Sequence, residues 1–433
     1  MAEAPARSNI SLVAAICIGI GGMVGAGIFS ILGVVAEASG NAIWISFLIG
    51  GLVALLSSYS YAKLGARYPS AGGAVEFLVQ GYGDGIISGG INIFLWLGYV
   101  IALALYANAF AGYAMTFFGP GMPVWLPNSL AVGIVLLFTA INARGAKSMG
   151  SSETLIVFIK VGILAFFAIS GVFFIKPELL STSHWPAGSE MLFGAGVLFI
   201  GYEGFGLVAN AAGDMDNPQR TLPKALYLSV LIVILIYLAV SLVVVGNLPI
   251  AEIVKTKDFA LAAAAQPFLG SIGFKLIAIA ALFSTSSAIN ATLFGGSNVS
   301  YMVAKDGQIP KVFANMVGGR FSEGLLVTSG LVILFVLLFD LSKIAMMGSA
   351  AFLLVYAAVN GAHIRLIKQT GAKALVVWLS ILTCLGMFGV LSVYILRTAP
   401  DALIAMAILL VASFLLEIAY RSLSKRTLKT ANS

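Results

Sequence analysis

Charge is scarce in this sequence. Of its 433 residues, 9% are charged and 60% are hydrophobic, and the mean hydropathy is +1.04. Soluble domains carry roughly 25% charged residues, so this chain has too few to cover a surface exposed to water. Most of the chain must face lipid or the interior of a helix bundle, which makes the lipid bilayer its first expected partner.

Cysteine and histidine are nearly absent. The two cysteines, Cys17 and Cys384, lie inside apolar runs, which excludes a disulfide framework, and neither of the two histidines belongs to a metal-ligand pattern. The net charge of +7 sits in short clusters between apolar runs, so no nucleic-acid partner is expected. The sequence also lacks a phosphate loop and a soluble catalytic domain. We therefore predict no enzyme activity, no metal and no cofactor other than protons.

Long apolar runs dominate the chain. They exceed the roughly ten alternating residues of a barrel strand. Because a membrane-spanning backbone must satisfy its own hydrogen bonds, they predict an all-α membrane protein. We expect twelve transmembrane helices at 10–36, 41–61, 86–113, 128–143, 152–175, 191–211, 223–246, 273–303, 324–339, 344–364, 374–395 and 400–420. With a cytoplasmic N-terminus, most of the 24 Lys and Arg fall in cytoplasmic segments, so both termini are predicted to be cytoplasmic.

Spans one and six are rich in glycine near their middles. Gly19–Phe29 contains five glycines, and Gly194–Gly206 has the same feature. Each glycine weakens a helix by about 1 kcal/mol relative to alanine, so both spans are predicted to be broken. Freed N–H groups attract a carboxylate and freed carbonyls attract an ammonium, which suits an amino acid. The alternative is that these glycines only permit close helix packing.

Interrupted helices at corresponding places in two inverted halves indicate a transporter site. Spans one and six are five apart, which fits a five-plus-five inverted repeat within a single transmembrane domain, 1–433. The first repeat would be helices one to five at 10–175, and the inverted second repeat would be helices six to ten at 191–364. Helices eleven and twelve, 374–420, would then be peripheral.

Five motifs, in order and at suitable spacing, resemble the amino acid–polyamine–organocation (APC) superfamily. They are Gly25–Phe29, Tyr61–Leu64 with the following Pro69 and Ala71–Gly73, Phe199–Glu203, Asp216–Pro223 and Ala304–Pro310. The resemblance covers nearly the whole chain. It implies a LeuT-like fold of ten core helices plus two peripheral ones.

The same resemblance implies a substrate site. The amides around Gly25, Ala26 and Gly27 would hold the substrate carboxylate. The substrate ammonium would donate to the carbonyls of Met23, Val197 and Ile200. The aromatic side chains of Phe199 and Tyr202 would line or gate the pocket. Many relatives have Ser or Thr where this chain has Ala26, so carboxylate recognition must depend here on backbone amides.

Lys160 lies in the middle of span five with no acid near it in sequence. A charged lysine at the bilayer centre costs about 2.5–3.5 kcal/mol on insertion scales, so it is a functional candidate by default. The alternative is that its side chain snorkels to the interface. Lys160 also matches a helix-five lysine which, in a proton-coupled prokaryotic branch of the family, takes the place of a sodium ion. The resemblance implies that it bridges helix five to carbonyls of helix one and links protonation to substrate binding.

Two further polar features lie inside spans. Glu203 follows the glycine break of span six, and we expect it either to orient the unwound backbone or to take part in proton transfer. Ser286 and Ser287 belong to a hydroxyl cluster that begins at Ser284. Similar residues help to bind sodium in sodium-coupled relatives. The alternative is a structural role, in which these hydroxyls form hydrogen bonds between helices.

These features predict a proton-coupled symporter in the cell membrane, with a broad preference for neutral amino acids. A sodium-coupled symporter or an amino acid exchanger is the alternative within the same class. A membrane receptor that binds an amino acid without moving it is the alternative from another class. The sequence leaves the oligomeric state open.

Overall fold

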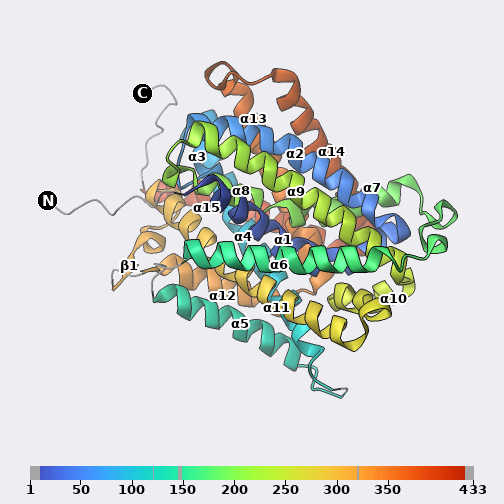
Figure 1. The fold of residues 1–433 in the computed structure, drawn as a ribbon. Coiled ribbons are helices and arrows are strands. Elements are labelled where there is room, and N and C mark those ends of the chain that lie inside the picture. Colours follow the sequence, from blue (N-terminus) through green and yellow to red (C-terminus); the bar gives the residue numbers. More distant parts are fainter. Residues whose placement is uncertain (1–9, 120, 145–148, 319–320, 425–433) are drawn as a thin grey trace.

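The computed structural model describes residues 10–119, 121–144, 149–318 and 321–424, with the backbone alone at Ala26 and at 149–153 (Figure 1). Its helices are α1 Leu12–Ser39, α2 Ile43–Arg67, α3 Ala74–Tyr82, α4 Ile86–Met115, α5 Leu126–Ala143, α6 Met149–Val172, α7 Gly188–Val197, α8 Phe205–Asn210, α9 Pro218–Asn247, α10 Ile250–Lys255, α11 Ala260–Lys305, α12 Glu323–Leu338, α13 Leu341–Thr370, α14 Ala374–Thr398 and α15 Pro400–Ser424. Two short strands, β1 Met316–Val317 and β2 Phe321–Ser322, pair antiparallel.

Short 3₁₀ helices connect these elements. They are η1 Gly40–Ala42, η2 Pro177–Leu180, η3 Thr182–His184, η4 Leu198–Tyr202, η5 Ala212–Asp214, η6 Lys257–Phe259 and η7 Lys311–Ala314. The helices α3 and α10, the strands and the connectors other than η4 were not among the predicted elements, because each is too short to give a long apolar run; η4 lies within predicted span six.

The apolar helices confirm a multi-pass, all-α membrane protein. Ten helical stretches among the described residues are long and apolar enough to cross a membrane. One of them, Leu12–Arg67, contains both α1 and α2, and α12 with 16 residues is shorter than the roughly 20 of a typical span. Each predicted span overlaps one helix, or the α7–α8 segment in the case of span six. The count of twelve transmembrane helices stays a prediction.

Local sequence explains where several helices begin, end or bend. The Ser11 hydroxyl accepts from the amide of Ala14 (3.2 Å), and the Asp340 carboxylate accepts from the amide of Lys343 (2.9 Å), so each side chain satisfies a free amide at a helix start. Gly371 ends α13 in the left-handed conformation (φ 61°), which glycine adopts without steric cost. Gly270, with φ 63° and ψ −160°, bends α11 away from its first ten residues.

The predicted break in span one is wrong for this structure. The backbone of α1 is helical without interruption from Leu12 to Ser39. The physical reason is that its glycines face neighbouring elements at close range. A Cβ at Gly22 would lie 2.9 Å from Leu207 Cδ1, and a Cβ at Gly27 would overlap the hydroxyl of Tyr237. The alternative interpretation of the glycine run, close helix packing, therefore describes α1.

Helices five spans apart pack on one another. The long helix α1 contacts α7, η4 and α8, while α2 contacts α9, α4 contacts α11, and α5 contacts α12. In Figure 1, α1 and the short helix α8 lie in the interior of the bundle, whereas α5 and α14 lie at its periphery. The segment that replaces a regular sixth span is thus surrounded by other helices.

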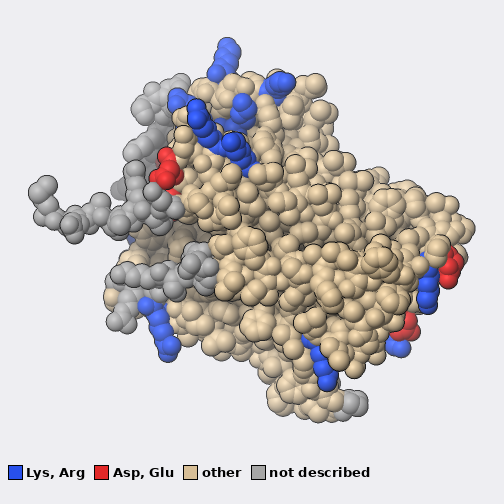
Figure 2. Space-filling view, viewed as in Figure 1, with Lys and Arg blue, Asp and Glu red and all other residues tan. Residues whose placement is uncertain are grey.

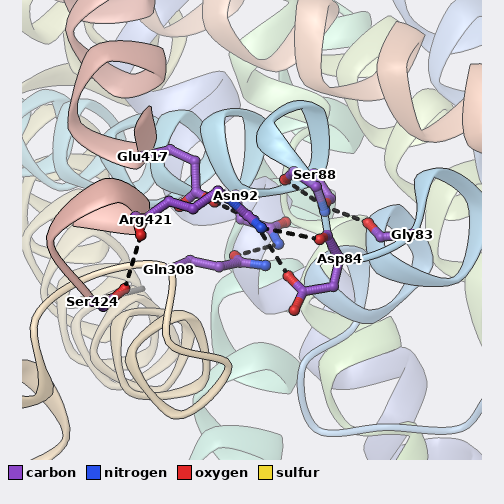
Figure 3. Close-up of polar contacts among 9 residues, drawn as sticks. Gly83, Asp84, Ser88, Asn92, Gln308, Glu417, Arg421 and Ser424 are labelled. Carbon is purple, nitrogen blue, oxygen red and sulfur yellow. Dashed lines mark hydrogen bonds and ion pairs between the residues drawn. The ribbon is translucent and has the colours of Figure 1, made fainter. Parts of the chain in front are cut away.

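A polar cluster connects the last helix to the core (Figure 3). The Arg421 guanidinium of α15 donates to the Glu417 carboxylate (2.6 Å) and forms an ion pair with Asp84 (3.6 Å), which precedes α4. Close by, the Asn92 amide of α4 donates to Gln308 in the loop after α11 (2.8 Å). The contact between Arg421 and Asp84 fixes the end of α15 beside the start of α4, and the Asn92 contact holds the loop after α11 against α4.

Charged side chains are absent from the middle of the surface on the face shown in Figure 2. Figure 2 shows a broad uncharged surface across the bundle, with Lys and Arg gathered at the upper left, in the region of α2, α3 and α13. That distribution fits an apolar belt between two polar ends, as a bilayer requires.

Candidate functional site

The sixth span is interrupted, as predicted. Its first half, α7, ends at Val197, the chain continues as the 3₁₀ helix η4, and α8 begins at Phe205. A 3₁₀ segment replaces i+4 hydrogen bonds by i+3 bonds and is uncommon beyond a few residues, so this change often marks a functional site. The glycines at the break allow contact with α1, because a Cβ at Gly201 would lie 2.8 Å from Gly27 Cα.

Ser349 of α13 satisfies the backbone at this interruption. Its hydroxyl accepts from the amide of Ile200 (2.9 Å) and donates to the carbonyl of Val197 (2.6 Å). The Ile200 carbonyl accepts from the amide of Glu203 (3.1 Å). The two carbonyls that the resemblance implied for a substrate ammonium thus have protein partners here, and they lie close together in a fully buried region.

Tyr237 of α9 joins α1 to η4. Its hydroxyl lies 2.6 Å from the Met23 carbonyl and 3.0 Å from the Gly201 carbonyl, and it can donate to either one. Gly27 leaves the space that this hydroxyl occupies. Met23, predicted to accept from the substrate ammonium, therefore accepts from a phenol instead, at a point where α1, η4 and α9 meet.

The predicted gate residues leave the break in different directions. The Tyr202 hydroxyl donates to the Phe47 carbonyl of α2 (2.8 Å). The Phe199 ring packs edge-on against Tyr356 of α13, with 5.7 Å between ring centroids. Both side chains are fully buried, so in this structure they close the region on two sides.

The substrate carboxylate would require amides from the middle of α1. Gly25 and Gly27 lie inside the continuous helix, and Gly25 contacts α11, because a Cβ there would overlap Ala288. The side chain of Ala26 lies outside the described part of the structure, and its backbone is helical. The structure brings these residues beside the interruption of span six without freeing their amides.

Lys160 is buried and reaches α1. Only 2% of this residue is exposed, and its ammonium donates to the Gly21 carbonyl at 2.9 Å. The predicted fifth span, which is α6, therefore contacts a carbonyl of the first span, α1, as expected. The side chain does not snorkel to the interface in this structure. Gly21 is two residues before Met23, so the lysine and the tyrosine contact act on the same stretch of α1.

Glu203 follows η4 and is 1% exposed. One carboxylate oxygen accepts from the Tyr106 hydroxyl of α4 at 3.4 Å, and the other has no hydrogen-bond partner among the described residues. The Glu203 carbonyl accepts from Tyr356 (2.9 Å). Of the two expected roles, orientation of the unwound backbone by its carboxylate is not seen here, because the carboxylate accepts from a tyrosine on another helix; proton transfer stays a prediction.

Comparison with known proteins decides the family. A profile described as amino acid permease matches residues 10–414. The chain belongs to the amino acid permease family of the APC superfamily. It is 40% identical over 422 residues to an uncharacterized protein of Methanocaldococcus jannaschii, with 97% of each chain covered.

Two further relatives carry functional names. The inner membrane transport protein YbaT of Escherichia coli is 35% identical over 352 residues, covering 81% of this permease and 82% of the relative. The serine/threonine exchanger SteT of Bacillus subtilis is 30% identical over 313 residues, covering 70% of each chain. The permease is accordingly a membrane transporter of small molecules of the amino acid class and not an enzyme.

The hydroxyl cluster of the permease lies beside an apolar groove. Ser286 and Ser287 of α11 line a groove of about 480 Å³ together with residues of α4, α5 and α6, among them Ile156 one turn before Lys160. Thr285 donates to the Ala281 carbonyl of its own helix (2.8 Å), as serine and threonine commonly do inside helices. The Thr285 bond lies within α11, and a role for Ser286 and Ser287 stays a prediction.

The sequence did not predict the contacts of Tyr237 and Ser349. Each is one of several scattered polar residues in an apolar span, and its partners are separated from it by long stretches of chain. The sequence gives one weak indication: a hydroxyl inside the bilayer must donate to an acceptor. Each such residue therefore predicts a hydrogen bond, but the sequence does not identify its partner.

Proposed function

We propose that this permease is a proton-coupled amino acid symporter of the cell membrane with a preference for small neutral amino acids. The observation that carries the proposal is the buried contact between Lys160 and the Gly21 carbonyl. A cation held there repels a sodium ion at the same place. In this proposal Lys160 is the group that loads and releases the proton, because it is an ionisable side chain in direct contact with the backbone of α1.

The proposed substrate site adjoins this lysine. It comprises the amides of Gly25, Ala26 and Gly27 for the carboxylate, the carbonyls of Met23, Val197 and Ile200 for the ammonium, and Phe199 and Tyr202 as its walls. In this structure the Met23 carbonyl accepts from Tyr237 and the Val197 carbonyl from Ser349, so a bound zwitterion either displaces these donors or uses a lone pair that opening of the backbone releases. The ammonium offers both carbonyls a charge-assisted bond, which is stronger than a neutral one.

The finer architecture belongs to the same proposal. Pairing of spans one with six, two with seven, three with eight and four with nine is what a five-plus-five repeat would produce, and it supports a LeuT-like fold with twelve transmembrane helices. Ser286, Ser287 and Glu203 are proposed as supporting residues. Most Lys and Arg lie at the end that carries the start of α1, so both termini are proposed to be cytoplasmic.

Uptake by purified permease in proteoliposomes tests the proposal. All twenty amino acids are screened with a pH gradient, with a sodium gradient, and with neither. Lys160→Ala is expected to lower pH-driven accumulation at least tenfold, whereas Lys275→Ala, the same change at an exposed position of α11, leaves it unchanged. Melting temperatures and counterflow show whether Lys160→Ala still folds and binds. Normal pH-driven uptake in that variant would remove Lys160 from the coupling mechanism.

Exchange is the second candidate function, and the similarity to the exchanger SteT is what favours it. An exchanger gives counterflow of labelled amino acid without accumulation under either gradient. The receptor alternative receives no support, since this family consists of transporters.

A further inference from the structure

A second pocket lies at the end of the bundle, away from the proposed substrate site. It has a volume of about 450 Å³, which is within the range of about 300–1,000 Å³ for small-molecule sites. The last turns of α2, the first turns of α9 and the end of α13 form it. Its lining residues are Ala62, Lys63, Ala66, Arg67, Gln219, Pro223, Tyr227, Gln369 and Thr370.

The pocket is electropositive. Lys63 and Arg67 line it from successive turns of α2, and the lining contains no acidic residue. The ion pairs recorded among the described residues involve other lysines and arginines, so neither cation has a carboxylate within 4 Å in that part of the chain. Arg67 lies over the Tyr68 ring, with 5.7 Å from its guanidinium carbon to the centroid, which leaves its N–H groups free for an anion.

Neutral donors accompany the two cations. The Gln369 carbonyl oxygen accepts from the Tyr68 hydroxyl, so its amide N–H₂ group remains as a donor. Gln219 and Tyr227 of α9 also line the pocket, on the side opposite α2. Two positive charges combined with amide and hydroxyl donors suit a phosphate, which presents several strong acceptor oxygens.

A lipid surface continues from the pocket. On α9, one turn after Tyr227, the exposed side chains of Leu231 (43%) and Leu235 (67%) follow toward the middle of the bundle, with Leu228 beside them (41%). Exposed leucines on a transmembrane helix face acyl chains. A phosphate in the pocket could therefore belong to a phospholipid whose chains lie along these leucines.

We propose that this pocket binds the headgroup phosphate of an anionic phospholipid at the end of the bundle that carries Lys63 and Arg67. Basic pockets between transmembrane helices recognise such headgroups, and each Lys or Arg near the membrane surface contributes about 1 kcal/mol, or roughly fivefold in affinity. The proposal does not depend on the transported substrate or on the coupling ion.

Native mass spectrometry of the intact, detergent-purified permease tests it, with phosphatidylglycerol and phosphatidylcholine of the same acyl chains as probes. Wild type is expected to retain phosphatidylglycerol preferentially. Lys63→Gln/Arg67→Gln should lower that affinity roughly 30-fold. Lys311→Gln/Lys368→Gln, which removes the same charge from exposed positions at the same end outside the lining, should not.

Three controls keep the result decisive. Lys63→Arg preserves the charge and should retain the lipid, and melting temperatures verify that each variant folds. Glycerol phosphate without acyl chains separates a soluble anion from a lipid. Equal retention of the two lipids, an equal loss in the Lys311/Lys368 control variant, or glycerol phosphate binding as tightly as phosphatidylglycerol would each overturn the proposal.

Discussion

Alanine at Gly27 distinguishes the two explanations for the glycine run of α1. A Cβ at this position overlaps the Tyr237 hydroxyl, so either α1 or the tyrosine must move. Overpacking typically costs about 1–3 kcal/mol. The Tyr237 hydroxyl has a single proton, so loss of its hydrogen bond to the Met23 or the Gly201 carbonyl costs about 1 kcal/mol. The gain in helix propensity returns about 1 kcal/mol. The net expectation is a destabilisation of roughly 1–3 kcal/mol.

The matched control for this variant is Gly133→Ala in α5, where an added Cβ has open space around it. That change should be neutral or stabilise the helix by up to about 1 kcal/mol. Thermal unfolding of both variants in the same detergent provides the comparison, together with amino acid uptake in proteoliposomes. Close packing predicts that Gly27→Ala melts well below wild type and Gly133→Ala does not.

A different outcome would refute this reasoning. If Gly27 serves only to weaken α1, alanine should raise the melting temperature, as it does at an open site, and impair uptake without loss of fold. A variant of Gly27 that melts at or above the temperature of Gly133→Ala would therefore overturn the packing explanation.

Two further predictions concern the break in span six and the loop after α11. Ser349→Ala removes the hydroxyl that bonds to both Ile200 and Val197, so it should destabilise the permease by about 2–3 kcal/mol in thermal unfolding. Ser349→Thr keeps a hydroxyl and should retain much of the stability. Wild-type stability in the alanine variant would contradict the role of that hydroxyl. Burial raises the pKa of Asp306 and the Glu76 carboxylate raises it further, so ionised Asp306 opposes folding at neutral pH. Asp306→Asn should therefore raise the melting temperature at pH 7, and a gain that persists below about pH 3, where the carboxyl is protonated in both states, would contradict this cause.

Apolar length made most of the fold predictable. Span two, expected at 41–61, is the helix Ile43–Arg67, and span eleven, expected at 374–395, is Ala374–Thr398. Span eight is the instructive exception, because α11 begins at Ala260 rather than at 273. Pro267 and Gly270 lie at the bend that divides α11. In the sequence these two residues indicate an end of helix, but they do not indicate that another helical segment precedes them.

A contact in the site was predictable where the chemistry of a single residue requires a particular kind of partner. Lys160 had to find an acceptor inside the bilayer, and a carbonyl of α1 is what it contacts. The glycine runs were ambiguous, because glycine permits both close packing and loss of helix; span six shows an interruption and α1 does not. Tyr237 and Ser349 could not be assigned partners, since nothing local in the sequence encodes a contact across the bundle.

Three donors from three helices converge on carbonyls of α1, and this arrangement connects the proposed proton site to the proposed substrate site. Lys160 donates to Gly21, Tyr237 to Met23, and Tyr113 of α4 to Phe29 (3.0 Å). A helical carbonyl has a second lone pair, so these bonds coexist with the helix. If a turn of α1 opens for a substrate, the same donors already satisfy carbonyls that the turn releases, which lowers the cost of opening. Loss of the Lys160 proton removes the charge from one of them. In the proposed mechanism, protonation therefore changes the free energy of that opening through Gly21, two residues from the carbonyl offered to the substrate.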